Sequence, residues 1–284
     1  MKRFSPVLGA VTIVAAIVGY VVWQRPAAPV PPPPAPKEVV VQYADGSKLW
    51  STAEEGMVRP ELVKLVSAEL HAANLPLDEL KVVGGVVRTT IDARIETVSA
   101  TVVGRLVAPN QRLSATVTAI DPASGGVLAY VPGPNRDRTN LADEQQETVP
   151  ELAEPFARAD APNLVQARMR PLDVTAAYAT FAAGGVQRRA HFVASVTGAD
   201  GSSLYQASDA EKSVFGNDVA DRVTLALKEN PACNGVACVP DAFPWAVGYT
   251  PQLAVTVLVD ETGGDVDAGL SAAIWQELVA ELTD

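Results

Sequence analysis

The chain has 284 residues and a formal net charge of −11, and its charges are unevenly placed. Three of its 22 basic residues and none of its 33 acidic residues precede Lys37, so the remainder carries a net charge near −14. Binding to the phosphate backbone of a nucleic acid depends on clustered Lys and Arg. We therefore expect no nucleic-acid partner.

An apolar run from about Val7 to Trp23 follows the basic residues Lys2 and Arg3. The run is at the short limit for a helix that spans a bilayer, and the basic start predicts a cytoplasmic N-terminus. A cleaved signal peptide has a similar pattern, but the run is long for one and lacks a clear small-residue cleavage site. We expect residues 1–25 to form a cytoplasmic tip and a single transmembrane anchor in the cell membrane.

Residues 26–36 are almost entirely Pro, Ala and Val. This composition favours extended polyproline II, which acts as a semi-rigid spacer of roughly 30 Å at this length. The body, residues 37–284, would then lie outside the cytoplasm. It is long enough for one large domain or two small ones.

The first part of the body alternates strand and helix patterns. The elements expected in chain order are a strand from Val39 that turns at Asp45-Gly46, a helix opened by Pro60 that stops before Leu75, a strand from Val86 to Ile91, a helix capped by Asp92, and a hairpin of Leu113 to Ile120 with Val127 to Val131.

Residues 132–162 are polar and acidic and have no sustained hydrophobic period. We expect a loop there, with helix possible only around Leu152 to Phe156. A loop of this length is unusual in a compact domain, and it indicates a deletion, a flexible excursion or a functional segment.

Regular patterns resume after this segment. The expected elements are a helix through Leu172 and Phe181 ending at Gly184-Gly185, a hairpin of His191 to Val196 with Ser203 to Gln206, a helix capped by Asn217 or Asp218, strands Trp245 to Tyr249 and Leu253 to Val259, and a last helix capped by Ser271. Such a mixture predicts an α+β fold with a largely antiparallel sheet.

Four segments resemble, in the same order, the transpeptidase domain of class A penicillin-binding proteins. They are Gly84 to Asp92 (GGVVRTTID), Thr118 to Val131 (TAIDPASGGVLAYV), Pro171 to Gly185 (PLDVTAAYATFAAGG) and Trp245 to Leu253 (WAVGYTPQL). The resemblance implies a reduced penicillin-binding, serine β-lactamase-like fold with an antiparallel sheet and flanking helices. It covers the chain from about residue 60 onward, with a break at 132–162.

The three catalytic motifs of that family, Ser-x-x-Lys, Ser-x-Asn and Lys-Thr/Ser-Gly, do not occur in the chain. Acyl-enzyme chemistry needs a serine activated by a neighbouring base, and no lysine here has Ser or Thr three positions before it. The break at 132–162 falls where the resemblance places the serine helix, so we expect this loop to replace the catalytic helical subdomain. The family's glycosyltransferase domain has no counterpart between residue 37 and the transpeptidase-like region.

Cys233 and Cys238 are the two cysteines of the chain, and they flank Asn234-Gly235-Val236-Ala237. Export and an even cysteine count favour a disulfide, and Asn-Gly favours a tight turn. Free thiols remain an alternative, as does a metal site, although the histidines His71 and His191 are remote in sequence. The resemblance places the third motif at these positions, where a disulfide-closed turn would have replaced a cationic strand.

Other candidate residues carry weaker signals. Asp241 reads as a turn residue, His191 as a structural or surface histidine, and Lys212 as a solvated lysine. Tyr178, Phe181 and Trp275 stand at helical spacing and read as core aromatics. A Ser-His-Asp triad is not excluded by spacing, but no nucleophile elbow occurs.

We therefore expect a membrane-anchored pseudoenzyme with no catalytic residue, metal or cofactor and with unknown binding residues. Its expected role is binding or scaffolding in peptidoglycan assembly, with wall-synthesis proteins or peptidoglycan peptides as partners. One alternative is an active transpeptidase or hydrolase with an unrecognised nucleophile. Another is a decayed duplicate without a role.

Overall fold

The computed structural model describes residues 37–54, 56, 59–107, 113–133, 140–208, 210–261 and 267–283. All the features below belong to the unit Pro36–Asp284. The expected anchor (1–25) and spacer (26–36) lie outside the described residues. Within the described part, no helix has the length and apolar character needed to cross a bilayer.

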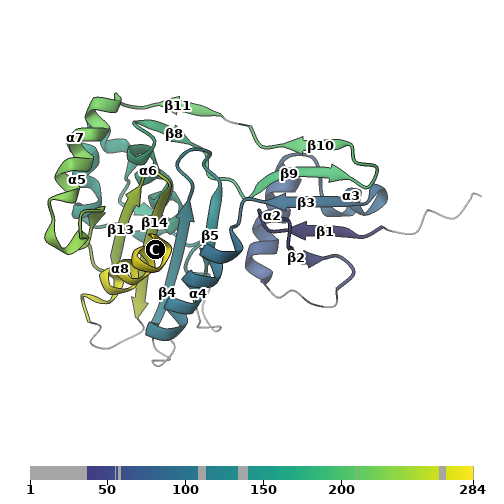
Figure 1. Ribbon diagram of the computed structural model, residues 1–284, viewed down its shortest axis with the longest axis horizontal. Coiled ribbons are helices and arrows are strands. Elements are labelled where there is room, and N and C mark those ends of the chain that lie inside the picture. The colour runs from purple at the N-terminus through teal and green to yellow at the C-terminus, as the bar shows by residue number, and fades with distance from the viewer. Residues whose placement is uncertain are drawn as a thin grey trace, which may run out of the picture. The chain divides into compact units, whose positions relative to one another are not determined.

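The smaller sheet, with α2 and α3 beside it (Figure 1), has the strand order β10-β9-β3-β1-β2. Neighbours are antiparallel except β1 and β3, which run parallel. The bounds are β1 Val39–Gln42, β2 Lys48–Ser51, α2 Pro60–Ala72, α3 Leu77–Val83, β3 Gly85–Thr89, β9 Val193–Gly198 and β10 Ser203–Gln206.

The larger sheet has the order β12-β13-β14-β4-β5 and is antiparallel throughout. The bounds of its strands and main helices are α4 Ala93–Val107, β4 Leu113–Ile120, β5 Val127–Val131, α6 Pro171–Ala182, β12 Ala237–Val239, β13 Trp245–Thr250, β14 Leu253–Glu261 and α8 Leu270–Thr283. Helices α4 and α8 pack on one face and α6 on the other. Figure 1 shows α8 and α4 in front of these strands and α6 behind them.

Strand β4 is buried at all eight positions, because helices cover both faces of the sheet. Its alternating sequence predicts one buried and one polar face, but its hydroxyl residues lie in the interior as well. Buried polar groups need hydrogen-bond partners. Thr118 and Thr175 of α6 provide this for each other at 2.6 Å, and Thr116 donates to the carbonyl oxygen of Val131 at 2.8 Å.

The sequence predicts most helix ends correctly. The side chain of Asp92 accepts hydrogen bonds from the backbone N–H groups of Arg94 and Ile95, as expected of an N-cap. Helix α6 ends at Gly184 and Gly185, both with positive φ. Ser271 is an exception, because α8 already begins at Leu270 and the buried Ser271 hydroxyl donates to the carbonyl oxygen of Trp245.

The segment 132–162, expected to be a loop, is more ordered than its polar composition indicates. It contains β6 (Gln146–Glu147) and α5 (Pro150–Arg158), which is longer than the short helix considered around Leu152 to Phe156. Two apolar residues fix α5 to the core: Phe156 lies 5.0 Å from the ring of Tyr178, and Tyr178 donates to the carbonyl oxygen of Leu152 at 2.9 Å. Tertiary packing thus overrides the weak local pattern.

Several short elements were missed because they carry too few residues for a periodic signal. They are α3, the 3-10 helices Pro162–Leu164 and Pro231–Cys233, β7 Arg168–Met169, which pairs with β6, and the ribbon of β8 Val186–Arg188 with β11 Glu211–Ser213. Lys212 is exposed as expected, but it lies in β11. The expected helix after Phe215 is α7, Asn217–Lys228, and neither Asn217 nor Asp218 is its N-cap, since Gly216 occupies that position.

Gly248 of β13 supplies a test of this packing. A Cβ at this position would overlap the Cζ2 atom of Trp275 in α8 and would lie 2.7 Å from the carbonyl oxygen of Ala237. We expect Gly248→Ala to lower the free energy of unfolding by about 1–3 kcal/mol, as overpacking does. Gly104→Ala is the control, because nothing lies near Gly104 and alanine favours a helix interior. Denaturant melts of equal stability for the two variants would contradict the prediction.

Candidate functional site

The two cysteines form a disulfide at the edge of the larger sheet, which confirms the sequence prediction. Their Cα atoms are 5.6 Å apart, and both residues are 2 % exposed. Asn234 and Gly235 make the intervening turn with φ values of 49° and 78°, which Asn and Gly tolerate best. The two alternative predictions for these cysteines, free thiols and a metal site, are therefore wrong.

Strand β12, which contains Cys238, is the edge strand of the larger sheet and pairs with β13 through Cys238 opposite Gly248. In the family that the sequence resembles, the strand before the Trp-x-Val-Gly-Tyr-Thr-Pro segment carries the cationic third motif. Here residues 233–240 contain no basic side chain. Strand β12 therefore precedes and pairs with β13, the order that the resemblance predicts for the third-motif strand.

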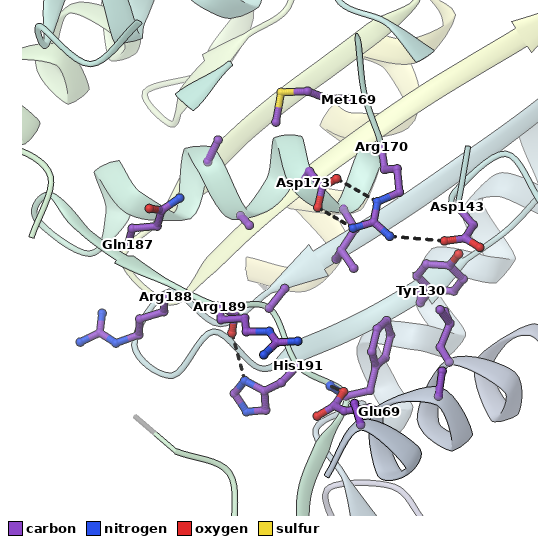
Figure 2. A pocket seen from close by; sticks show the side chains of 18 of the residues that line it. Glu69, Tyr130, Asp143, Met169, Arg170, Asp173, Gln187, Arg188, Arg189 and His191 are labelled. Carbon is purple, nitrogen blue, oxygen red and sulfur yellow. Dashed lines mark hydrogen bonds and ion pairs between the residues drawn. The ribbon is translucent and has the colours of Figure 1, made fainter. Parts of the chain in front are cut away.

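A cleft of about 990 Å³ lies between α2, the β8–β9 connection and α6 (Figure 2). Small and aromatic side chains form much of its surface, among them Ala68, Ala72, Ala176, Tyr130 and Tyr205. Its volume is at the upper end of the range typical of ligand pockets. The cleft is therefore the candidate binding site among the described residues.

Four arginines and one histidine line the cleft, together with three carboxylates. The cations are Arg168, Arg170, Arg188, Arg189 and His191, and the carboxylates are Glu69, Asp143 and Asp173. This balance is unusual for the chain, in which acidic residues outnumber basic ones by 33 to 22. The distribution of partners among these groups decides which charge the cleft presents.

Arg170 holds two of the three carboxylates. Its Nε and Nη2 atoms donate to the two oxygens of Asp173 at 2.8 and 3.0 Å, and its Nη1 atom lies 3.6 Å from Asp143 (Figure 2). The bidentate hydrogen bonding to Asp173, with the charges of both carboxylates, raises the pKa of Arg170. These three residues form a closed ionic group at the start of α6.

Glu69 of α2 is bound by the backbone. Its two carboxylate oxygens accept hydrogen bonds from the N–H groups of Phe192 and Val193 at 2.7 and 3.2 Å. This contact ties α2 to the start of β9. Both carboxylate oxygens of Glu69 are therefore occupied by backbone donors.

Three of the remaining cations, Arg188, Arg189 and His191, lie along the chain from β8 to β9 (Figure 2), whereas Arg168 lies on β7. Arg188 pairs with Glu211 at 2.8 Å and also donates to the carbonyl oxygen of Pro122. The exposed Arg189 pairs with no acidic side chain among the described residues. Burial, and then the charge of Glu69, raises the pKa of Tyr205, and the charge of Arg189 opposes this shift. Arg189 and Tyr205 both line the cleft.

The residues of the cleft that the structure describes form no assembled nucleophile. No lysine lines it, and Ser208 is its one serine among the described residues. His191 contacts the carbonyl oxygen of Arg189 through Nδ1 at 3.3 Å, and no described hydroxyl forms a hydrogen bond with its ring. The expected structural or surface role of His191 is consistent with this position, and no triad is formed around it. The described part of the chain also holds no cluster of three or more metal-ligating side chains.

Sequence reasoning did not find the cleft. Its residues come from α2, β5, the 140–170 segment, α6 and the β8–β10 region, and each arginine taken alone reads as an ordinary surface residue. The dipeptide Arg188-Arg189 is the one local signal. Asp241 is exposed and away from the cleft, and Tyr178, Phe181 and Trp275 are buried core residues, as expected.

Comparison with known proteins gives matches of two kinds. Part of the chain is 31 % identical over 146 residues to penicillin-binding protein 1A of Mycobacterium tuberculosis, and 34 % identical over 122 residues to that of Mycolicibacterium smegmatis. These matches cover 40 % and 36 % of this chain but only 18 % and 16 % of the relatives. No family model matches.

Solved transpeptidase structures share the fold at lower identity. The PonA1 protein of Mycobacterium tuberculosis with penicillin V has a TM-score of 0.65 at 19 % identity, over 78 % of this chain and 92 % of the other. The D,D-transpeptidase domain of a peptidoglycan glycosyltransferase from Eggerthella lenta has a TM-score of 0.63 at 12 % identity, over 88 % and 99 %. Part of this chain is therefore homologous to penicillin-binding protein 1A, and the described residues have the fold of penicillin-binding transpeptidase domains.

The homologue has retained the elements that carry the four resembling segments. Segment 84–92 contains β3, 118–131 contains the β4–β5 hairpin, 171–185 is α6 with its glycine end, and 245–253 contains β13. Strands β4, β5 and β13 and helix α6 belong to the larger sheet and its covering layer. The reduced transpeptidase-like fold with an antiparallel sheet and flanking helices is confirmed.

Glu96 of α4 is a fully buried carboxylate that contacts Tyr130, a residue of the cleft. It accepts hydrogen bonds from the backbone N–H of Tyr130 and from Arg59, both at 2.8 Å, and is 0 % exposed. Burial raises the pKa of Glu96 despite these two partners. The folded state therefore binds this proton more tightly than the unfolded chain does.

This shift predicts a pH-dependent difference in stability. When the pKa of a carboxyl group is higher in the folded state, protonation stabilises the folded protein. This stabilisation is complete below the unfolded-state pKa and is lost as the pH rises through the folded-state pKa. Glu96→Gln removes the titration, so its stability relative to the original chain should increase from pH 4 to pH 7 in urea melts. The exposed Glu154→Gln is the control, and a Glu96→Gln difference that is flat or falls with pH would contradict the assignment.

Proposed function

We propose that this homologue is a catalytically inactive, penicillin-binding-protein-like module that binds or scaffolds components of peptidoglycan assembly. The observation that carries the proposal is a retained fold without the reacting groups. No serine or threonine stands three residues before any lysine, and the edge strand β12 carries a disulfide in place of a cationic motif. A serine hydroxyl without an adjacent base is a weak nucleophile at neutral pH.

The proposed location is the outer side of the cell membrane, with residues 1–25 as anchor and 26–36 as spacer. Its support is the apolar run, its flanking charges and the disulfide, which is typical of oxidising compartments. The proposed partners are wall-synthesis proteins or peptidoglycan peptides. No nucleic acid, metal or cofactor is part of the proposal.

An active transpeptidase or hydrolase with an unrecognised nucleophile is the competing function. One observation favours keeping it: Ser208 and His191 line the same cleft. However, no hydrogen bond joins them among the described residues, and the neighbouring Glu69 is bound to backbone donors. A penicillin-labelling experiment separates the two functions.

We expect the full-length chain in detergent to form no covalent adduct with a fluorescent penicillin, because it lacks an activated serine. After incubation, denaturation and gel electrophoresis, PonA1 of Mycobacterium tuberculosis should give a fluorescent band and this chain none. A stoichiometric band that disappears on substitution of a single serine, with Ser208→Ala as the first variant, would overturn the proposal.

The scaffolding role predicts specific neighbours in the cell. A photo-crosslinking residue at the exposed position Glu144 or Glu151 should capture a discrete partner, because these positions lie in segment 132–162, which we propose replaces the catalytic helical subdomain. The same residue at exposed Thr101 on α4 is the control. Absence of a specific product, together with an unchanged cell wall after gene deletion, would instead indicate a decayed duplicate.

A further inference from the structure

The cleft beside α6 presents positive charge on a strongly acidic protein. Of the three carboxylates among its described residues, Asp143 and Asp173 are paired with Arg170, and Glu69 accepts from two backbone N–H groups. None of the three pairs with Arg168 or Arg189 among the described residues. Arg168 and Arg189 therefore have no carboxylate partner among the described residues, and both can bind a negatively charged group of a ligand.

The two available arginines are exposed and come from different elements. Arg168 of β7 donates through Nη2 to the carbonyl oxygen of Gln145, a neutral partner, and Arg189 follows β8 without an ionic partner in the described chain. Guanidinium groups bind carboxylates through paired N–H donors. The arrangement therefore suits a ligand that has carboxylates at more than one point.

The surface of the cleft suits a peptide rather than a small anion. Ala68 and Ala72 of α2, Ala73 directly after it and Ala176 of α6 leave open space, and Tyr205 provides an aromatic surface with a polar tip. A cleft of about 990 Å³ is large for a single anion. Small side chains permit close approach of a backbone, and tyrosine is enriched where proteins bind one another.

We propose that this cleft is the docking site for an extended, acidic segment of a partner protein, held by Arg168 and Arg189. The inference rests on the proposed binding function and locates that function in the cleft. Complementary charge would accelerate association and make it salt-dependent. The remainder of the protein, with its net negative charge, would repel the same segment, so binding is directed to the cleft.

Binding of a labelled hexaglutamate peptide to the full-length chain in detergent tests the site by fluorescence anisotropy. We expect saturable binding at low salt that weakens at least fivefold in Arg189→Glu and at least fivefold between 50 and 300 mM NaCl. Arg222→Glu is the charge-matched control, since Arg222 is exposed on α7 outside the cleft. Equal affinities of the two variants, or no saturable binding, would overturn the proposal.

A steric variant distinguishes the cleft from nonspecific attraction. Ala68→Trp introduces a large side chain at an exposed α2 position inside the cleft, and Ala157→Trp does so at an exposed α5 position outside it. We expect only Ala68→Trp to weaken peptide binding, at least threefold, with unchanged thermal unfolding in both. Undiminished binding in Ala68→Trp would place the peptide elsewhere.

In cells, a photo-crosslinking residue at Ala72 should capture a protein, and Arg189→Glu should abolish the product. Capture of peptidoglycan fragments instead would overturn the assignment of a protein partner. The outcome is separable from that of the proposed function, because penicillin labelling tests inactivity without involving Arg189. A product captured through position 144 but not through position 72 would support the scaffolding role and would contradict the cleft as the binding site.

Discussion

The pairing of β4 with β14 is the interaction on which the remaining structure depends. The two strands pair over the whole length of β4, from Leu113 opposite Glu261 to Ile120 opposite Ala254. Each then receives one further strand, β5 or β13, and helices cover both faces. Because these central strands are buried on both faces, a shift of one residue in their pairing would move every side chain to the opposite face. The helices on both faces therefore depend on this register.

The helices on the two faces of the larger sheet enclose two different hydrophobic cores. Helices α4 and α8 enclose an apolar core that includes Val102, Val257 and the disulfide. On the opposite face, α6 contributes the aromatic group of Tyr178 and Phe181 to a core that continues into the smaller sheet. The cleft opens beside this second layer, so its walls rest on a rigid scaffold.

The sequence predicts the elements of the larger sheet well because their signals are local. Leu113 to Ile120 has β-branched residues and a following turn, and Pro171 and Gly184 mark the ends of α6. The cysteine pair is predictable for the same reason, since its turn lies between the two residues. Helix α5 is harder, because its stability depends on Phe156 reaching Tyr178, which is remote in the chain.

The candidate site was beyond sequence reasoning for a physical reason. Whether Arg170 or Arg189 offers its charge to a ligand depends on which carboxylates lie beside it, and that is decided by the fold. Arg170 is bound to Asp173 on its own helix, whereas Arg189 is left without an ionic partner in the described chain. Absence of the catalytic motifs, in contrast, can be read directly from the sequence, because each motif is a short contiguous pattern.

The contact of Gly248 with Trp275 has a consequence for how the sequence can drift. The indole occupies the space that any side chain at position 248 would need, so the two positions share one volume. A larger residue on β13 is compatible with the fold only when the residue on α8 becomes smaller. Among natural variants of this protein, positions 248 and 275 should therefore change together or remain fixed together.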